Sequence, residues 1–348
     1  MPNYHEFIDT GPKRESAWRG IVLLGANVQS YKFALAQSLI ELASDGRQEV
    51  TLEELAVPFS EHLCTHLKTE DKQGTPRSSQ FLDTCRAYNK GNTAYEQLIE
   101  TTIRLGFNNV LDAFHVVGNG TAPVGFFQVA GSGVKRKVSL TDDVFSIASG
   151  SQAGNLKGET EARWRLVEAA WKLGIETRTL AGGVALDAER NELAIQFGGR
   201  RISLAGARGA IGGYQKGVCF YCGIEITEEG ELSAHGEVDH FIPWSLNQPV
   251  FNRSVNLDGV WNLVVACQDC NRGASGKFAN LPSLVMLDRL NSRNEFYIFS
   301  HHPLREALIA QTGLLPNERS SYLNKVWQAA RDHGLSIWEP IQRAAQPF

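Results

Sequence analysis

Residues that can bind metal ions or move protons are concentrated between Lys216 and Lys277. Four of the six cysteines form two Cys-x-x-Cys pairs, which are Cys219 with Cys222 and Cys267 with Cys270. The dipeptide Asp239-His240 lies between the pairs, and Asn271 follows the last cysteine directly. Thiolates suit soft or borderline ions, whereas carboxylate and amide oxygens suit hard ions. The stretch therefore carries donors for two kinds of metal chemistry.

The spacing of the cysteines predicts a structural zinc ion. Both sulfurs of a Cys-x-x-Cys turn can reach one ion, and four thiolates leave no open position on tetrahedral Zn2+. The alternative is a redox dithiol, which needs a thioredoxin-like strand–helix–strand pattern beside the pair, and the sequence shows none. Cys64 and Cys85 stand alone in helical-looking stretches, and we expect both to be buried thiols.

The residues between the two cysteine pairs resemble a known motif. We expect Asp239-His240 at the end of a strand, because Pro243 cannot continue a hydrogen-bonded ladder. We expect Asn271 in a helix that continues towards Lys277. The two cysteine pairs, the Asp-His with its following proline, the Asn-Leu-Val at 262–264 and the terminal Cys-Asn closely resemble the HNH endonuclease family.

That resemblance implies a ββα-metal fold with a role for each matching residue. It implies that Asp239 and Asn271 bind a catalytic Mg2+ or Mn2+ ion and that His240 is the general base. It also implies that Asn262 holds the loop and orients the histidine. Oxygen donors suit such a hard ion, and an unperturbed histidine pKa near ~6.5 suits a base at neutral pH. Glu237 either lines the metal site or faces solvent.

The charge of the chain limits how it can bind nucleic acid. The formal net charge is −4 at pH 7, which argues against a polycation that coats nucleic acid. DNA binding must then rest on metal and a few placed cations, and Arg272 and Lys277 are candidate phosphate contacts. The basic run at 135–137 is a further candidate, although exposed charge runs usually only solvate a surface.

The composition is that of a globular protein without a membrane segment. No apolar run approaches the roughly 20 residues of a membrane span. The first 13 residues are polar and unlike a secretory signal. We therefore expect a cytoplasmic protein.

Hydrophobic periodicity predicts an α+β chain of three parts. Residues 1–205 are expected to form a mostly helical recognition or regulatory domain that ends in a β-hairpin over 183–204. Residues 206–285 are the expected nuclease domain with its zinc knuckle, and 286–348 a helical extension packed on it. Phe296–Phe299 is expected to be a short strand, and Trp244 and Trp261 to be core residues.

The predicted function is DNA cleavage in bacterial anti-phage defence or restriction. Since HNH domains nick one strand per active site, double-strand cutting implies a homodimer or sequential nicks. Two alternatives stay open. One is a zinc-stapled nucleic-acid-binding or partner-binding protein without turnover. The other is a nuclease that is latent until a partner activates it, such as a helicase, an ATPase or a signalling enzyme encoded nearby.

Overall fold

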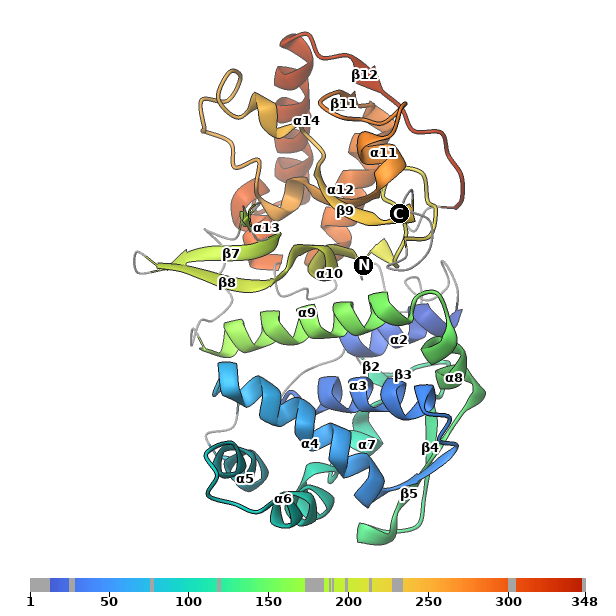
Figure 1. Ribbon diagram of the computed structural model, residues 1–348. Coiled ribbons are helices and arrows are strands. Elements are labelled where there is room, and N and C mark those ends of the chain that lie inside the picture. The colour runs from blue at the N-terminus through green and yellow to red at the C-terminus, as the bar shows by residue number, and fades with distance from the viewer. Residues whose placement is uncertain are drawn as a thin grey trace. The chain divides into compact units, whose positions relative to one another are not determined.

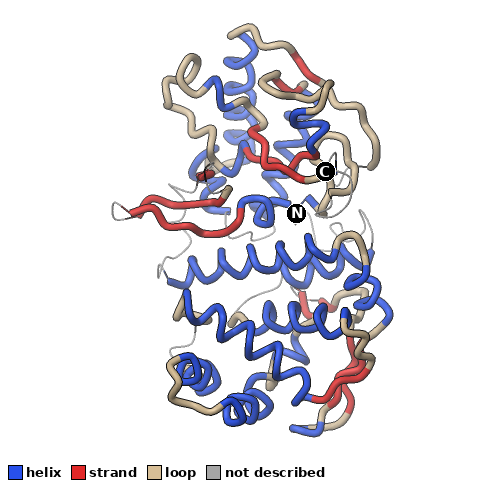
Figure 2. The backbone as a smooth tube through the Cα atoms, in the orientation of Figure 1, coloured by secondary structure: helices blue, strands red, loops and turns tan. Residues whose placement is uncertain are grey.

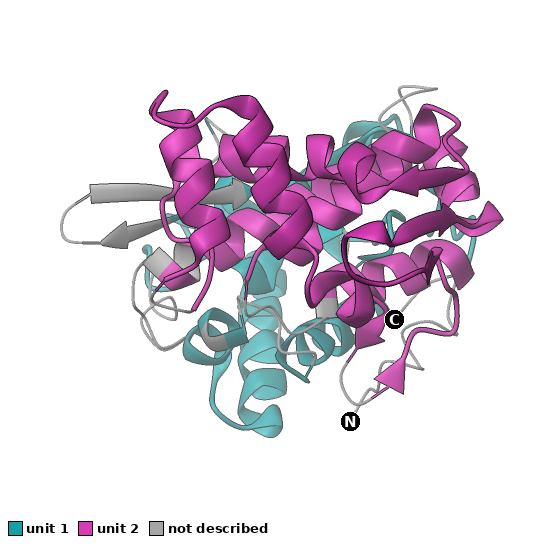
Figure 3. Ribbon diagram, turned by 90° about the horizontal axis from the view of Figure 1, so that it is seen from below, with its two compact units in different colours: residues 1–7, 175–348 teal, residues 8–174 magenta. Residues whose placement is uncertain are grey.

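The computed structural model of the chain contains two compact units (Figure 1, Figure 3). The N-terminal unit is Ile8–Gly174, and the C-terminal unit is Ile175–Phe348 together with Met1–Phe7. The described residues are 13–24, 29–75, 78–117, 120–172, 185–187, 189, 191–197, 200–212, 215–226, 234–299 and 305–345. Helices combined with small sheets agree with the expected α+β class. The expected domain boundaries at 205 and 285 both fall inside the C-terminal unit.

Helices make up most of the N-terminal unit (Figure 2). They are α2 (Lys13–Leu24), α3 (Tyr31–Ser44), α4 (Leu52–Thr69), α5 (Gln80–Asn89), α6 (Tyr95–Thr101), α7 (Val110–Ala113), α8 (Asp142–Ser149) and α9 (Ala153–Lys172). Helix α3 is buried along most of its length and packs against α4, α8 and α9. A helix that is apolar around most of its circumference must lie inside its domain. Helix α3 is therefore the centre of this core.

Local sequence signals set several ends of these elements. Helix α4 begins at a capping box, in which the Thr51 side chain accepts from the Glu54 amide and Glu54 accepts from the Thr51 amide. Strand β1 (Glu49–Thr51) pairs with β5 (Lys137–Leu140), which also pairs with β4 (Phe127–Ala130). A second small hairpin joins β2 (Val116–Val117) to β3 (Gly120–Thr121).

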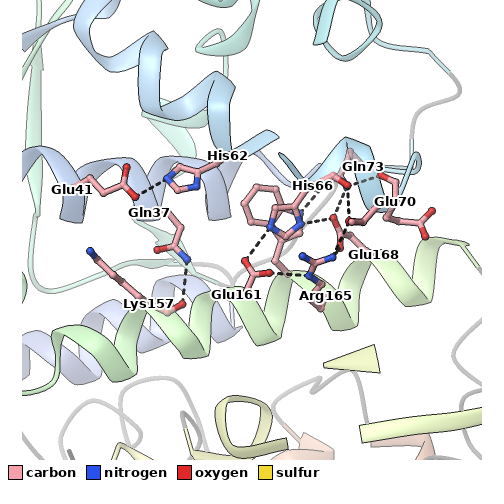
Figure 4. Close-up of polar contacts among 12 residues, drawn as sticks. Gln37, Glu41, His62, His66, Glu70, Gln73, Lys157, Glu161, Arg165 and Glu168 are labelled. Carbon is pink, nitrogen blue, oxygen red and sulfur yellow. Dashed lines mark hydrogen bonds and ion pairs between the residues drawn. The ribbon is translucent and has the colours of Figure 1, made fainter. Parts of the chain in front are cut away.

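A buried charged network links α4 to α9 (Figure 4). The Nδ1 atom of His66 lies 2.7 Å from Glu168, and its Nε2 atom lies 3.0 Å from Glu161. The imidazole also stacks on Trp164, with ring centroids 3.5 Å apart. Burial acts to lower the pKa of His66, but the hydrogen bonds to the two glutamates raise it above its usual range. His66 therefore joins the two helices as a cation.

Three strands begin the described part of the C-terminal unit. Strand β7 (Glu192–Phe197) pairs with both β6 (Ala185–Asp187) and β8 (Arg200–Gly206) in an antiparallel sheet. The expected two-stranded hairpin is therefore a three-stranded sheet. Helix α10 (Ala207–Gly212) follows it directly.

The rest of the unit surrounds a two-stranded sheet. Strand β9 (Gly236–His240) pairs antiparallel with β10 (Leu263–Cys267), and α11 (Gln268–Arg272) follows. The outer elements are β11 (Leu281–Pro282), α12 (Leu284–Phe299), α13 (Arg305–Thr312), α14 (Pro316–Asp332) and β12 (Ile337–Trp338). None of the described helices combines the length and the apolar character needed to cross a membrane.

Helix α12 corrects one prediction and fixes the start of β10. Residues 296–299 form its last turn and not a strand, because Tyr297 continues the buried helical face and donates to the Ile211 carbonyl. Arg293 on the same helix is fully buried and donates to the carbonyls of Val260 and Trp261, at 3.1 and 3.2 Å, as well as to that of Leu263. One guanidinium thus satisfies three backbone acceptors beside the small sheet.

We predict that His66→Ala lowers the free energy of unfolding of the N-terminal unit by about 3–5 kcal/mol, because it removes the nearest cation from the buried Glu168 carboxylate, while Arg165 still pairs with Glu161. The matched control is His62→Ala, since His62 lies on the same helix but makes a partly exposed pair with Glu41, and its loss should cost at most about 1 kcal/mol. Urea denaturation followed by circular dichroism measures both.

The pH dependence of this difference has a fixed sign. Because the pKa of His66 is raised on folding, its contribution is complete below the unfolded value of ~6.5 and is lost as pH rises through the folded value. The difference in the free energy of unfolding between wild type and His66→Ala should therefore become smaller as the pH rises. A difference that grows with pH would contradict the charged network.

Candidate functional site

The four cysteines come together in one buried cluster. Their sulfur atoms all lie within 4.8 Å of one another, and the sulfurs of Cys222 and Cys267 are 3.8 Å apart. A tetrahedral zinc ion with Zn–S bonds of about 2.3 Å requires sulfurs about 3.8 Å apart. Burial raises the pKa of the Cys219 thiol, so a cation is needed to hold several thiolates together. The donor set fits the predicted Zn2+.

Three separate segments supply and support this cluster. Cys219 and Cys222 lie in a tight turn closed by the Gly223 amide, which donates to the Cys219 carbonyl at 3.0 Å. Cys267 ends β10 and Cys270 lies in α11. Gly223 has a φ of +79°, and a Cβ atom there would lie 2.5 Å from the Ala344 carbonyl oxygen. Only glycine fits between the turn and the C-terminal segment.

The C-terminal segment (residues 335–345) crosses the cysteine turn. The amides of Arg343 and Ala344 donate to the Cys222 carbonyl at 2.9 and 3.0 Å. The Gln342 side chain donates to the same carbonyl at 3.1 Å. These bonds hold the first Cys-x-x-Cys pair from outside the residues that carry the motif.

Asp239 is a buried carboxylate with two partners. The Tyr221 hydroxyl donates to its Oδ2 atom at 2.6 Å, and the Lys277 Nζ atom lies 3.3 Å from Oδ1. Burial raises the pKa of Asp239, although Lys277 and Tyr221 act against that shift. Lys277 is itself only 1% exposed. The lysine predicted to contact phosphate therefore faces a carboxylate inside the protein.

His240 lies at the end of β9, opposite Leu263 in the register. Its Nε2 atom lies 2.9 Å from Asp258 Oδ1. Because a carboxylate accepts, Nε2 carries the proton and Nδ1 keeps its lone pair. Sequence reasoning missed Asp258, because its position in the loop 18 residues later gave no signal. Only the folded loop brings it to the histidine.

Trp244 corrects a second prediction. Trp261 is fully buried as expected, but Trp244 is 54% exposed. Trp244 begins a short 3-10 helix, Trp244–Leu246, in which Leu246 is buried. The Trp244 indole donates to Asp258 Oδ2 at 3.3 Å. Its polar edge is thus held beside His240 while much of the ring stays in solvent.

Asn262 is fully buried and holds the loop between the strands. Its Oδ1 atom accepts from the Ile242 amide at 2.7 Å. Its Nδ2 atom donates to the carbonyls of Ile242 and Leu257, at 3.0 and 2.9 Å. These three bonds fix the backbone two residues after His240 to the far end of the same loop.

Asn271 lies on α11 and faces β9. It donates to Glu237 at 2.8 Å, and Arg272 makes an ion pair with the same carboxylate. Glu237 and Asp239 point to one face of β9, because side chains two residues apart share a face of a strand. Among the described contacts, none joins Asp239 directly to Asn271. The two predicted metal ligands therefore have different partners, Lys277 and Tyr221 for Asp239 and Glu237 for Asn271.

Comparisons with protein-family models, with curated proteins and with solved structures give no match to this chain.

We predict that the purified chain contains one zinc ion and that Cys267→Ser loses it. Loss of the ion should also lower the unfolding temperature of the C-terminal unit, because the binding energy of a structural zinc is folding energy. Cys64→Ser is the control, since Cys64 is a buried free thiol of the N-terminal unit. Elemental analysis with thermal unfolding measures both effects. Full zinc content in Cys267→Ser would contradict the assignment.

Proposed function

We propose that the chain is a metal-dependent endonuclease of the HNH type that hydrolyses DNA phosphodiester bonds. The observation that carries the proposal is His240, which is partly exposed at a strand end and oriented by Asp258, directly beside Asp239. The order of Asp239, His240, Asn262 and Asn271 along the chain is that of the HNH motif. The cysteine cluster supplies the rigid frame that such a site needs.

The ring of His240 suits the role of general base. Asp258 accepts from Nε2–H, so the lone pair of Nδ1 takes the proton from the attacking water. Asp258 also stabilises the imidazolium that forms. Side-chain exposure of 17% leaves the histidine reachable from solvent.

Asp239, which precedes this base in β9, and Asn271 on α11 offer oxygen donors for a catalytic cation. Asp239 and Asn271 are the proposed ligands of Mg2+ or Mn2+, and Glu237 shares a face of β9 with Asp239. Such an ion, when bound, offsets the charge that develops on the phosphate oxygens. The Lys277 ammonium now neutralises Asp239, so a cation is already accommodated against this carboxylate.

This internal neutralisation favours a latent form of the nuclease. Asp239 is satisfied by Lys277 and Tyr221, and Glu237 by Asn271 and Arg272. Ions and DNA must compete with these pairs, so activity can await a partner such as a helicase, an ATPase or a signalling enzyme. Such control suits a cytoplasmic anti-phage or restriction system. Cleavage that is equal with and without a co-purified partner argues against latency.

We predict that the protein cuts plasmid or phage DNA with Mg2+ or Mn2+ and that His240→Ala slows cutting by about 10²–10⁴-fold. His333→Ala, at the exposed end of α14, should cut like wild type. Gel assays under single-turnover conditions measure the rates. Equal cutting by His240→Ala and wild type would contradict the assignment of His240, and absence of cutting by both would support a binding protein without turnover.

We predict that Asp258→Asn slows cutting by about tenfold or more while DNA affinity is kept. The amide can offer Nε2 an oxygen, but it lacks the charge that stabilises the imidazolium. An unchanged rate would show that Asp258 only supports the loop.

A further inference from the structure

Two large exposed aromatic side chains are hydrogen-bonded to residues of the candidate site. Trp244 follows the Asp239-His240 dipeptide and is 54% exposed, and Phe278 follows Asn271 and Lys277 and is 55% exposed. Each is tied to residues of the site by hydrogen bonds. The position of each ring beside residues of the candidate site, and not its exposure alone, makes it a candidate ligand contact.

The ring of Trp244 is held by its edge. Its indole N–H donates to Asp258, whose other carboxylate oxygen holds His240. The Trp244 carbonyl accepts from the Asn247 amide at 2.9 Å and closes the 3-10 turn. The polar handle and the backbone are therefore fixed, and the apolar face is the part that remains for a ligand.

Phe278 is exposed to solvent and has a strained backbone conformation. Its φ is +47°, in the left-handed region that non-glycine residues avoid. Its amide donates to the Asn271 carbonyl at 2.9 Å, and its carbonyl accepts from Lys277 Nζ at 3.0 Å. The bonds that keep this strained residue in place thus come from two residues of the candidate site.

Arg272 and Lys277, two cations of the candidate site, are both paired with carboxylates, so affinity for nucleic acid needs another source. Arg272 is paired with Glu237, and Lys277 is buried against Asp239. With a net charge of −4, the chain cannot rely on bulk attraction to phosphate. Stacking of bases on aromatic rings provides affinity without charge and tolerates any base sequence. It requires unpaired bases, because a duplex hides their faces.

We propose that Trp244 and Phe278 stack unpaired bases of a nucleic acid bound at the candidate site, so that the ligand is single-stranded or locally unpaired DNA. This inference rests on the proposed function, because it places the nucleic acid at the same site. It names the substrate class of the enzyme. Trp244 provides the larger ring and the larger share of the affinity.

The test measures binding separately from cutting. All proteins carry His240→Ala, and fluorescence anisotropy follows a labelled single-stranded DNA of mixed sequence, the same DNA as a duplex, and an RNA of that sequence. Trp244→Ala should weaken binding of the single strand by about tenfold to a hundredfold, and Phe278→Ala by a smaller factor. The duplex should bind more weakly than the single strand. Tyr95→Ala is the aromatic control, since Tyr95 is 39% exposed in the N-terminal unit, and should bind normally.

A conservative variant separates stacking from support of Asp258. Trp244→Phe keeps an aromatic face but loses the indole N–H, so it should bind within about threefold of its parent. If it binds as weakly as Trp244→Ala, the bond to Asp258 matters and the stacking proposal is wrong. Normal binding by Trp244→Ala, or equal binding of duplex and single strand, also overturns it. Tighter binding of the RNA than of the DNA would overturn the choice of DNA.

Failure of this inference is distinguishable from failure of the proposed function. If the protein with His240 intact cuts DNA and Trp244→Ala leaves KM unchanged, only the stacking proposal fails. If that protein cuts nothing while Trp244→Ala still weakens binding of the single strand, only the nuclease proposal fails. Zinc content and unfolding temperature of each variant show that the fold is intact.

Discussion

The cysteine cluster is the constraint on which the C-terminal unit depends. An isolated two-stranded sheet is at best marginally stable in water, and β9, β10 and the five residues of α11 form little more than that. The cluster joins the turn at Cys219–Cys222 to the end of this small element. The guanidinium of Arg293 holds its other end through backbone carbonyls. Precise placement of His240 is possible because both ends of the element are fixed.

Buried charged side chains are paired differently in the two units. In the N-terminal unit, His66 is shared by two glutamates that belong to one helix, so a single cation links α4 to α9. In the C-terminal unit, the Lys277 ammonium faces Asp239 at 3.3 Å with help from Tyr221. The first network joins two helices of the N-terminal core. The second neutralises a carboxylate that directly precedes the partly exposed His240 in β9.

Local sequence signals predicted the parts of the structure that local chemistry determines. The Cys-x-x-Cys spacing predicted the cluster, and the capping box of Thr51 and Glu54 is an equally local signal for the start of α4. The wrong or missed features all depend on tertiary contacts. The end of α12 looks like a strand until Tyr297 is seen to bury against α10. Asp258 lies in a loop without a motif, and Trp244 is apolar but is held at the surface by that same carboxylate.

The loop between β9 and β10 carries the contacts that fix both His240 and Trp244. Asn262 ties its two ends together through Ile242 and Leu257, so the loop is fixed at its base. Within that loop, Asp258 reaches back to His240 while it holds Trp244 in solvent. One carboxylate therefore couples the orientation of the His240 ring to that of an exposed aromatic ring. The motif supplies the histidine, but the loop fold, through Asp258, sets the direction in which its ring points.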